Sequence, residues 1–231
     1  MITGANRGLG LALCGQYIDH GWQVISLSRS SSAELDRLAQ TGALEAHNAD
    51  LIDDSALDDF ADEMRDRSID VLINNAGTMG RKSFAEAGLD AQKFGTFDRD
   101  EWLSVFNINV CTPMHLAELF AEQIAASDCG RVVTVTSMLG SMGLNTIGSI
   151  YGYRASKAAV NAIMKSMAID LASRGIIAIA LHPGFVQTDM GGVGAEISPT
   201  ESAGGMFSVI DGLTPADSGK VFAWNGDHLP W

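Results

Sequence analysis

The chain has 231 residues, of which 46% are hydrophobic and 19% are charged, and this composition excludes a disordered protein and provides for a large buried core. Fifteen Lys and Arg against 28 Asp and Glu give a net charge of −13, which argues against partners such as nucleic acids or anionic membrane surfaces. The three cysteines form no CxxC pair, and no segment has the composition of a signal peptide or a membrane span. We therefore expect a cytoplasmic protein with one domain covering residues 1–231.

Apolar segments of strand length alternate with longer amphipathic segments along the whole chain. The strand candidates are apolar on both faces and cover 23–28, 44–47, 70–76, 131–137, 176–182 and 220–223. The helix candidates between them cover 8–20, 32–40, 55–67, 99–126 and 153–174. This order predicts an α/β fold, a Rossmann-type doubly wound parallel sheet with helices on both faces. Only Met1 and Ile2 precede the first turn, so we expect a first strand that is unusually short or trimmed.

Residues that favour helix ends stand at the expected boundaries. Asp53 and Asp98 are candidate N-caps, and Gly21 and Gly175 stand where a left-handed C-terminal cap requires glycine. A glycine-rich segment, 184–205, follows the strand candidate at 176–182. We expect a mobile substrate loop at about 190–206.

The first turn carries three glycines in the spacing Gly-x-x-x-Gly-x-Gly. Glycine at positions 4 and 8 allows a tight turn and close approach of a pyrophosphate, and Gly10 allows the following helix to pack closely. The N–H groups at the start of that helix would bind the anion. We expect a phosphate-binding turn formed by Gly4, Asn6, Arg7, Gly8, Leu9 and Gly10.

Tyr153 and Lys157 stand four residues apart and share one face of a predicted helix. A free tyrosine has a pKa near 10, and an ammonium group about 4 Å away could lower it by up to roughly three units. The spacing therefore favours an acid–base catalyst, and the alternative is an ordinary exposed pair on an amphipathic helix.

Further polar motifs stand where predicted strands end, the edge of an open α/β sheet where ligands bind. They are Asn74-Asn75-Ala76-Gly77, Ser137, and Pro183-Gly184-Phe185-Val186-Gln187-Thr188, joined by Asn109 on the long helix candidate. Together with the glycine turn and the Tyr153–Lys157 pair, this order resembles the short-chain dehydrogenase/reductase family over essentially the whole chain. Strings such as Asn6-Arg7-Gly8-Leu9-Gly10 and Tyr151-Gly152-Tyr153-Arg154 are most similar to its carbonyl reductase sniffer and C-factor-like group.

The resemblance implies four catalytic residues. Tyr153 would protonate the carbonyl oxygen, and Ser137 would hydrogen-bond and position it. Lys157 would lower the tyrosine pKa and bind the nicotinamide ribose, and Asn109 would hold a water that relays protons. Each of these residues also has a structural reading, and that of Asn109 is a buried residue that distorts the helix.

The resemblance also implies cofactor contacts along the carboxyl edge of the sheet. Asp50 would accept a hydrogen bond from the adenine amine, Asn75 would support the adenosine ribose, and Thr188 with the Val186 backbone would hold the carboxamide. The cofactor-binding set is completed by Leu51, Ala76, Gly77, Pro183, Gly184, Tyr153 and Lys157.

The end of the second strand candidate reads Ser28-Arg29-Ser30-Ser31 and lacks the carboxylate that selects NAD. Arg29, with Arg7 as a second positive charge, would pair with a 2′-phosphate, so we expect NADP(H). The expected function is NADPH-dependent reduction of an aldehyde, ketone or quinone-like carbonyl. The alternatives are an NAD-linked alcohol or steroid dehydrogenase and a nucleotide-binding signalling protein of the C-factor type.

The remaining expectations concern partners and metals. In this family the helices at 99–126 and 153–174 commonly form a dimer interface, so a homodimer is expected, with a tetramer as an alternative. The acidic residues between 50 and 59 are interpreted as a solvated helix start and not as a metal site.

Overall fold

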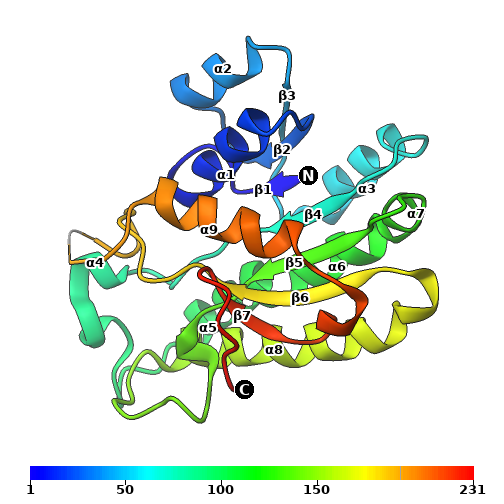
Figure 1. Ribbon diagram of the computed structural model, residues 1–231. Helices are drawn as coiled ribbons and strands as arrows, with labels where there is room; N and C mark the ends of the chain where they lie inside the picture. The colour runs from blue at the N-terminus through cyan, green and yellow to red at the C-terminus, as the bar shows by residue number, and fades with distance from the viewer. Residues whose placement is uncertain (193) are drawn as a thin grey trace.

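The computed structural model describes residues 1–192 and 194–231 and contains a seven-stranded sheet in the order β3-β2-β1-β4-β5-β6-β7 (Figure 1). All six strand pairings are parallel. The strands are β1 (Ile2–Thr3), β2 (Val24–Ser28), β3 (Leu44–Asn48), β4 (Val71–Asn74), β5 (Arg131–Val135), β6 (Ile177–His182) and β7 (Val221–Ala223). The strand order reverses between β1 and β4, which is where such sheets bind ligands. The predicted Rossmann-type sheet and its short first strand are confirmed.

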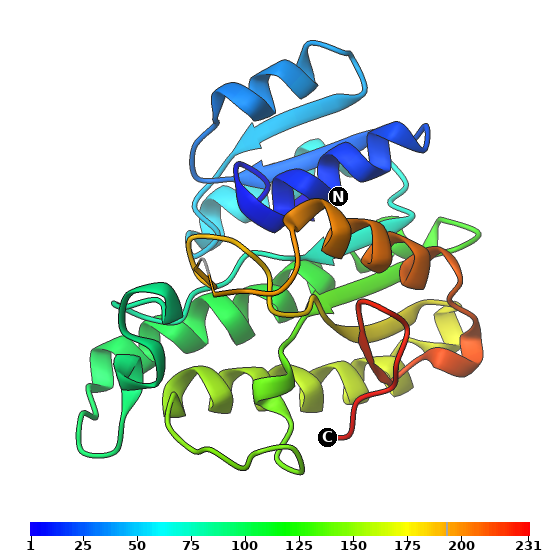
Figure 2. The same cartoon turned by 60° about the vertical axis from the view of Figure 1, so that its left-hand side comes forward.

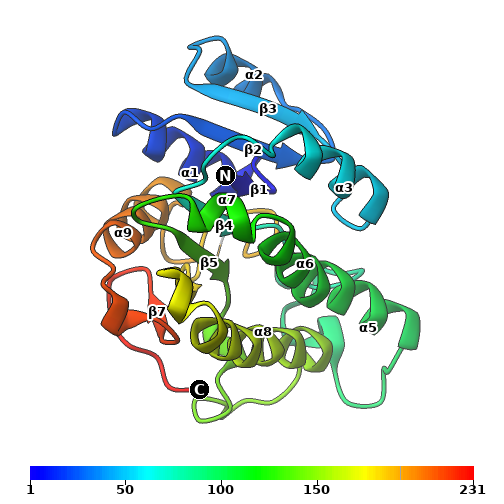
Figure 3. The ribbon, with the colours of Figure 1, turned by 90° about the vertical axis from the view of Figure 1, so that its right-hand side faces the viewer.

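Helices cover both faces of the sheet. One face carries α1 (Gly8–Asp19), α2 (Ala33–Ala39) and α9 (Pro199–Asp211), and α1 and α9 lie side by side (Figure 2). The other face carries α3 (Asp54–Glu63), α5 (Arg99–Phe106), α6 (Thr112–Leu119), α7 (Ala121–Ala125) and α8 (Tyr151–Asp170) (Figure 3). Shorter helices are α4 (Phe84–Ala87), η1 (Gly88–Gln92), η2 (Asn107–Cys111), η3 (Met138–Gly140), η4 (Ala172–Arg174) and η5 (Pro215–Asp217).

Two hydrophobic layers hold these helices to the sheet. Leu13 and Phe207 pack with strand residues on the α1 and α9 face, and Leu57 and Met164 pack with strand residues on the face of α3 and α8. Because residues on neighbouring positions of a strand point to opposite faces, each buried strand supplies both layers. The carboxyl ends of the strands are thereby fixed along one edge.

Several predicted helix boundaries are confirmed by their caps. The Asp53 carboxylate accepts a hydrogen bond from the Ala56 N–H (3.2 Å), and Asp98 does the same for Glu101 (3.0 Å). The cap after η4 is the left-handed Gly175.

The predicted helix 99–126 is interrupted, because η2 is a π-helical segment between α5 and α6, and α7 follows as a separate helix. The predicted loop at 190–206 needs a larger correction, because its part from 199 onward is the first half of α9. Ser198 caps this helix, Pro199 occupies its first position, and Met206 is buried against the sheet. Val193, inside the predicted loop, lies outside the described residues.

Candidate active site

The loop between β1 and α1 turns tightly at two glycines. Gly4 and Gly8 have φ angles of 65° and 54°, in the left-handed region that glycine adopts without strain. A Cβ at Gly4 would lie 2.9 Å from Cα of Ala76, and a Cβ at Gly8 would lie 3.3 Å from Cγ2 of Thr188. The turn therefore packs against the segments that follow β4 and β6, as the predicted cofactor site requires.

Thr3 and Asn75 hold this turn in place. The Thr3 hydroxyl accepts hydrogen bonds from the N–H groups of Asn75 and Ala76 (3.1 Å each), and Nδ2 of Asn75 donates to the carbonyls of Thr3 (2.9 Å) and Gly4 (3.3 Å). A Cβ at Gly10 would lie 2.6 Å from Nδ2 of Asn75. Gly10 thus makes room for Asn75 and lets the start of α1 pack closely against the Gly4 main chain. The Asn75 amide anchors the turn, and its contact with the ribose stays a prediction.

The amino end of α1 fits an anion. Arg7 at the N-cap makes no side-chain capping bond, the first turn contains no acidic residue, and the Leu9 side chain is buried in the core. The free N–H groups of a first helical turn and its positive dipole end bind phosphate. The Arg7 guanidinium forms an ion pair with Asp189, and both side chains are largely exposed. The role of Arg7 as a second positive charge near the 2′-phosphate stays a prediction.

The carboxyl end of β2 carries the residues expected to select the cofactor. Nδ2 of Asn6 donates to Oγ of Ser30 (3.3 Å), and the Ser28 hydroxyl donates to the Ser30 carbonyl (3.0 Å). These bonds join the glycine turn to the end of β2. Arg29 is exposed, and the arginine ion pairs among the described residues do not include it.

Asp50 and Leu51 lie just beyond the carboxyl end of β3, next in the sheet. The Leu51 carbonyl accepts a hydrogen bond from the Thr112 hydroxyl at the start of α6 (2.9 Å). The Asp50 side chain is exposed and accepts from the Ile52 N–H (3.3 Å). The structure places both residues on the predicted edge, and their contacts with adenine stay a prediction.

The predicted acid–base residues come together at the ends of α8 and β5. Tyr153 and Lys157 are 8% and 4% exposed, and Nζ of Lys157 lies 5.7 Å from the centre of the Tyr153 ring. The same Nζ donates a 2.7 Å hydrogen bond to the Val135 carbonyl at the end of β5. Ser137 follows two residues later, and its hydroxyl accepts from the Leu139 N–H (3.1 Å).

Burial is the main cause of the pKa shifts of Tyr153 and Lys157. Desolvation raises the pKa of Tyr153 to about 12, and a hydrogen bond with Ser137 opposes this shift. Desolvation also lowers the pKa of Lys157 to about 8. Desolvation is the dominant cause of the shift at Tyr153, and Nζ of Lys157 is bonded to the Val135 carbonyl, so the expectation that Lys157 lowers the tyrosine pKa stays a prediction.

Asn109 lies in the π-helical segment η2 and is only 1% exposed. Its Oδ1 accepts from the Thr78 N–H (2.8 Å), and its Nδ2 donates to the Thr78 carbonyl (2.8 Å) and to Oγ of Ser156 (3.0 Å). A Cβ at Gly77 would lie 3.3 Å from Oδ1 of Asn109 and 3.7 Å from Nζ of Lys157. The helix-distorting reading of Asn109 is confirmed, and its water relay stays a prediction.

The segment after β6 closes the site on the side of the glycine turn. The Pro183 carbonyl accepts from the Ser202 hydroxyl of α9 (2.6 Å), Val186 forms a bridge with Ile197, and Oγ1 of Thr188 accepts from the Gly191 N–H (3.3 Å). Gly184 has a φ of 86°, and a Cβ there would lie 2.9 Å from the Trp224 ring. These contacts bring Thr188 beside Gly8. α4 and this segment lie at the left of Figure 1.

Gln92 and Ser156 belong to the site but have no signal in the sequence. Oε1 of Gln92 accepts from the Tyr153 N–H (3.0 Å) across 61 residues of chain, and the Ser156 hydroxyl donates to the Tyr153 carbonyl (2.8 Å). The residues before α8, Ser149 and Ile150, have φ angles of 56° and 53°. Such left-handed residues cost on the order of 1–3 kcal/mol each, so the entry to α8 depends on these contacts.

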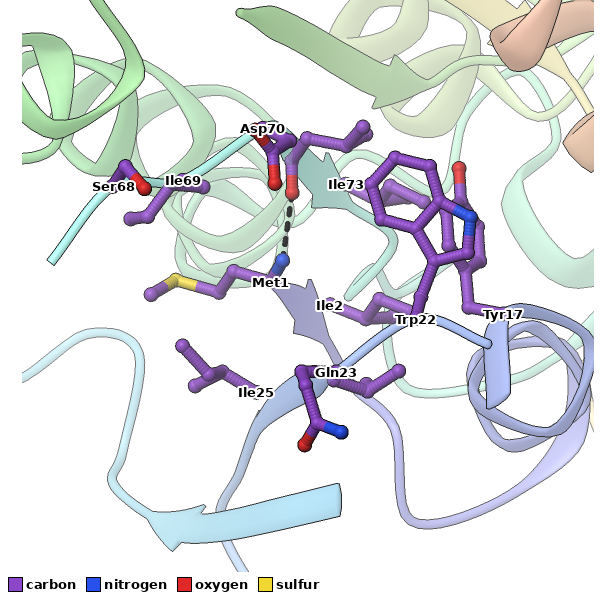
Figure 4. A pocket seen from close by; sticks show the side chains of 12 residues that line it. Met1, Ile2, Tyr17, Trp22, Gln23, Ile25, Ser68, Ile69, Asp70 and Ile73 are labelled. Carbon is purple, nitrogen blue, oxygen red and sulfur yellow. Dashed lines mark hydrogen bonds between the residues drawn. The ribbon is translucent and has the colours of Figure 1, made fainter. Parts of the chain in front are cut away.

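A cavity of about 60 Å³ lies at the opposite end of the sheet (Figure 4). Its lining includes Met1, Tyr17, Trp22 and Asp70, near the amino ends of β1, β2 and β4, and the Met1 amino group donates to the Val71 carbonyl (2.6 Å). The cavity is therefore separate from the candidate active site.

Over residues 1–192 and 194–231, no cluster of three or more His, Cys, Asp or Glu could hold a metal ion. Over the same residues, no helix combines the length and the apolar character that crossing a membrane requires.

The fold and the site together define a class, a Rossmann-type protein with a candidate nucleotide-binding site at the carboxyl edge of its sheet. Residues 1–196 match the family model described as short chain dehydrogenase, and the chain belongs to the short-chain dehydrogenase/reductase family.

Three known proteins illustrate the relationship. The C-signal protein of Myxococcus xanthus is 39% identical over 172 residues, which are 74% of this chain and 98% of that protein. The carbonyl reductase Sniffer of D. melanogaster is 30% identical, with a TM-score of 0.91 and coverage of 100% and 98% of the two chains. An NADPH-bound carbonyl reductase from chicken fatty liver is 26% identical, with a TM-score of 0.88 and coverage of 100% and 97%. The predicted resemblance to the sniffer and C-factor-like group is confirmed.

Proposed function

We propose that this protein is an NADPH-dependent carbonyl reductase that converts an aldehyde, ketone or quinone-like carbonyl to an alcohol. The proposal rests on the buried Tyr153 phenol, which lies beside Ser137 and Lys157 at the carboxyl edge of the sheet. The similarity to carbonyl reductases supports it. The glycine turn, Arg29, Lys157 and Thr188 would hold the cofactor, which would supply the hydride.

The chain's own residues would orient the carbonyl and deliver the proton. The Ser137 hydroxyl would hydrogen-bond the carbonyl oxygen, and the Tyr153 hydroxyl would donate its proton to the same oxygen as charge develops there. Lys157 would bind the ribose hydroxyls. Asn109 would support the path by which Tyr153 regains a proton.

Burial of Tyr153 is compatible with its role as a proton donor. With a pKa raised to about 12, the phenol keeps its proton at neutral pH, and a reduction requires the protonated form. An alcohol dehydrogenase working in the oxidative direction requires the phenolate as a base. The NAD-linked dehydrogenase is the weaker alternative because the end of β2, Ser28-Arg29-Ser30-Ser31, lacks the carboxylate that selects NAD.

The surroundings of Tyr153 favour an apolar substrate. Met79 and Ile150 form a buried cluster with Tyr153, and Phe84, Leu139 and Met190 pack against it. Such a wall desolvates the reacting carbonyl and binds apolar groups by burial. We expect aromatic or long-chain carbonyl compounds to be better substrates than small polar ones.

Purified protein should oxidise NADPH in the presence of a panel of aldehydes, isatin-like diketones and quinones. Tyr153→Phe should lower kcat by about 10²–10⁴-fold, the usual contribution of general acid catalysis, and leave the Kd for NADPH within about threefold. Tyr151→Phe is the matched control, because Tyr151 stands two residues earlier on the same helix and is exposed, and it should keep kcat. If Tyr153→Phe retains more than about a tenth of wild-type turnover, the catalytic assignment is wrong.

A nucleotide-binding signalling protein is the second candidate, favoured by the similarity to the C-signal protein. It predicts that NADPH binds while no carbonyl compound of the panel is reduced.

We also propose a homodimer through α5 and α8. These two helices lie against each other within the chain, and they carry the exposed side chains of Leu103 and Ile169.

A further inference from the structure

Gln92, the last residue of η1, joins three segments around the start of α8. Its side chain is 5% exposed, and its Nε2 donates to the Met79 carbonyl (2.6 Å). Its Oε1 accepts from the Tyr153 N–H (3.0 Å), and its main-chain carbonyl accepts from the Ile150 N–H (2.6 Å). Both polar atoms of the side-chain carboxamide and the main-chain carbonyl therefore have a partner.

Helix α8 has no side-chain cap of its own. Its N-cap residue is Ile150, an apolar residue in a left-handed conformation, and Tyr153 is the third residue of the helix. An N-cap side chain normally accepts a hydrogen bond from the N–H of this third residue. Oε1 of Gln92 accepts that bond instead, from a segment that is distant in the sequence.

A second carboxamide, that of Asn109, holds the Tyr153 carbonyl through Ser156. Oγ of Ser156 donates to the Tyr153 carbonyl (2.8 Å) and accepts from Nδ2 of Asn109 (3.0 Å). Asn109 binds both main-chain groups of Thr78, and Gln92 binds the carbonyl of the next residue, Met79. The two carboxamides thus tie both main-chain groups of Tyr153 to the segment 78–79.

Two glycines make room for the Gln92 side chain. A Cβ at Gly152 would lie 3.2 Å from Oε1 of Gln92 and 3.2 Å from Nε1 of Trp102. A Cβ at Gly80 would lie 3.1 Å from Nε2 of Gln92. Both distances to the Gln92 amide are shorter than ordinary van der Waals contact, so a side chain at Gly80 or Gly152 would crowd this amide.

We propose that Gln92 is a positioning residue, which acts through the Tyr153 main chain to hold the phenol at a fixed position relative to the segment 78–79. The same segment follows Ala76, which packs against the glycine turn at Gly4. Gln92 therefore fixes the distance between the proton donor and the cofactor-binding turn without touching the substrate. This inference rests on the proposed reductase function.

The test compares Gln92→Leu with Gln123→Leu in the full chain. Gln123 on α7 is also buried, and its main-chain carbonyl accepts from the Ile69 N–H just before the amino end of β4, away from the carboxyl edge of the sheet, so the pair controls for the removal of a buried amide. A displacement of about 1 Å at a reacting group costs on the order of a hundredfold, so Gln92→Leu should lower kcat by about tenfold to a hundredfold. It should leave the Kd for NADPH within about twofold, while Gln123→Leu leaves both constants within about twofold.

Gln92→Glu adds a pH readout that a purely structural role would not give. Protonated, the introduced carboxyl can still donate to the Met79 carbonyl and accept from the Tyr153 N–H, whereas the carboxylate cannot donate. Burial and the nearby Glu101 carboxylate raise the pKa of the introduced carboxyl. The kcat of Gln92→Glu relative to wild type should therefore fall by about threefold or more between about pH 6 and about pH 8.

Hydrogen exchange separates this inference from the proposed function, because it requires no turnover. Amide protons of the first turn of α8, 151–156, should exchange faster in Gln92→Leu than in Gln123→Leu and in wild type. Unchanged exchange there overturns the inference even if no substrate is found. A kcat of Gln92→Leu within about twofold of wild type, or a loss of NADPH affinity equal to the loss of kcat, also overturns it. Absence of wild-type turnover with altered exchange overturns the reductase proposal alone.

Discussion

Lys157 should make the cofactor step sensitive to pH just above neutrality. Desolvation lowers the pKa of this lysine from 10.5 to about 8, which corresponds to roughly 3 kcal/mol at about 1.4 kcal/mol per pH unit. The ammonium is thus present below about pH 8 and is lost above it. Because kcat/KM reports ionisations of the free enzyme, kcat/KM for NADPH should be level below about pH 7.5 and should fall by up to about tenfold per pH unit above about pH 8.

The assay is kcat/KM for NADPH at saturating carbonyl substrate from about pH 6.5 to about pH 9.5. Lys157→Ala should give a low and level profile, because the titrating group is gone. Lys165→Ala should reproduce the wild-type profile, since Lys165 lies on the same helix and is exposed. A wild-type profile that stays level to the highest pH, or a bend that persists in Lys157→Ala, would refute the reasoning.

Two further predictions concern the cofactor and the loop. Arg29→Ala should lower the ratio of kcat/KM for NADPH to that for NADH by about tenfold or more, since a charge-assisted hydrogen bond contributes about 1.5–3 kcal/mol. Arg37→Ala, on the exposed side of α2, should leave this ratio unchanged. An unchanged ratio in Arg29→Ala rejects Arg29 as the 2′-phosphate ligand. Hydrogen exchange at 190–192 and 194–198 should slow when NADPH and substrate bind, while 199–206, in α9, stays protected throughout. Equal protection of the first two segments with and without ligands would contradict the prediction that this loop becomes ordered on binding.

The sheet could be predicted because its strands are buried on both faces and therefore read as apolar runs. Predicted and observed strands differ by at most two residues at either end, and the short β1 followed from the position of Thr3. Helix α9 was not predicted, because Gly204 and Gly205 read as loop. The packing of α9 decides the outcome, since a Cβ at Gly205 would lie 2.5 Å from Cε3 of the Trp224 ring. Tertiary contact overrides local propensity at such positions.

The gathering of the site residues could also be predicted, because parallel strands end at a common edge. Ser137, Asn75 and Thr188 lie there as expected. The role of Gln92 could not be predicted, because a cap supplied from 61 residues away has no local spacing. The distortion at Asn109 was one of two readings of the sequence, because a π-helical turn continues the apolar pattern of a helix; the structure decides between them through the bonds of the side chain to Thr78.

The directions of the two pKa shifts identify the force that sets the proton donor. If attraction between the Lys157 ammonium and the Tyr153 phenolate dominated, the tyrosine pKa would fall and the lysine pKa would rise. Both move the other way, to about 12 and about 8, as desolvation requires. Burial of Tyr153 beside Met79 and Ile150 thus keeps the phenol neutral. In the proposed reduction, the neutral phenol is the form that would donate the proton to the carbonyl oxygen.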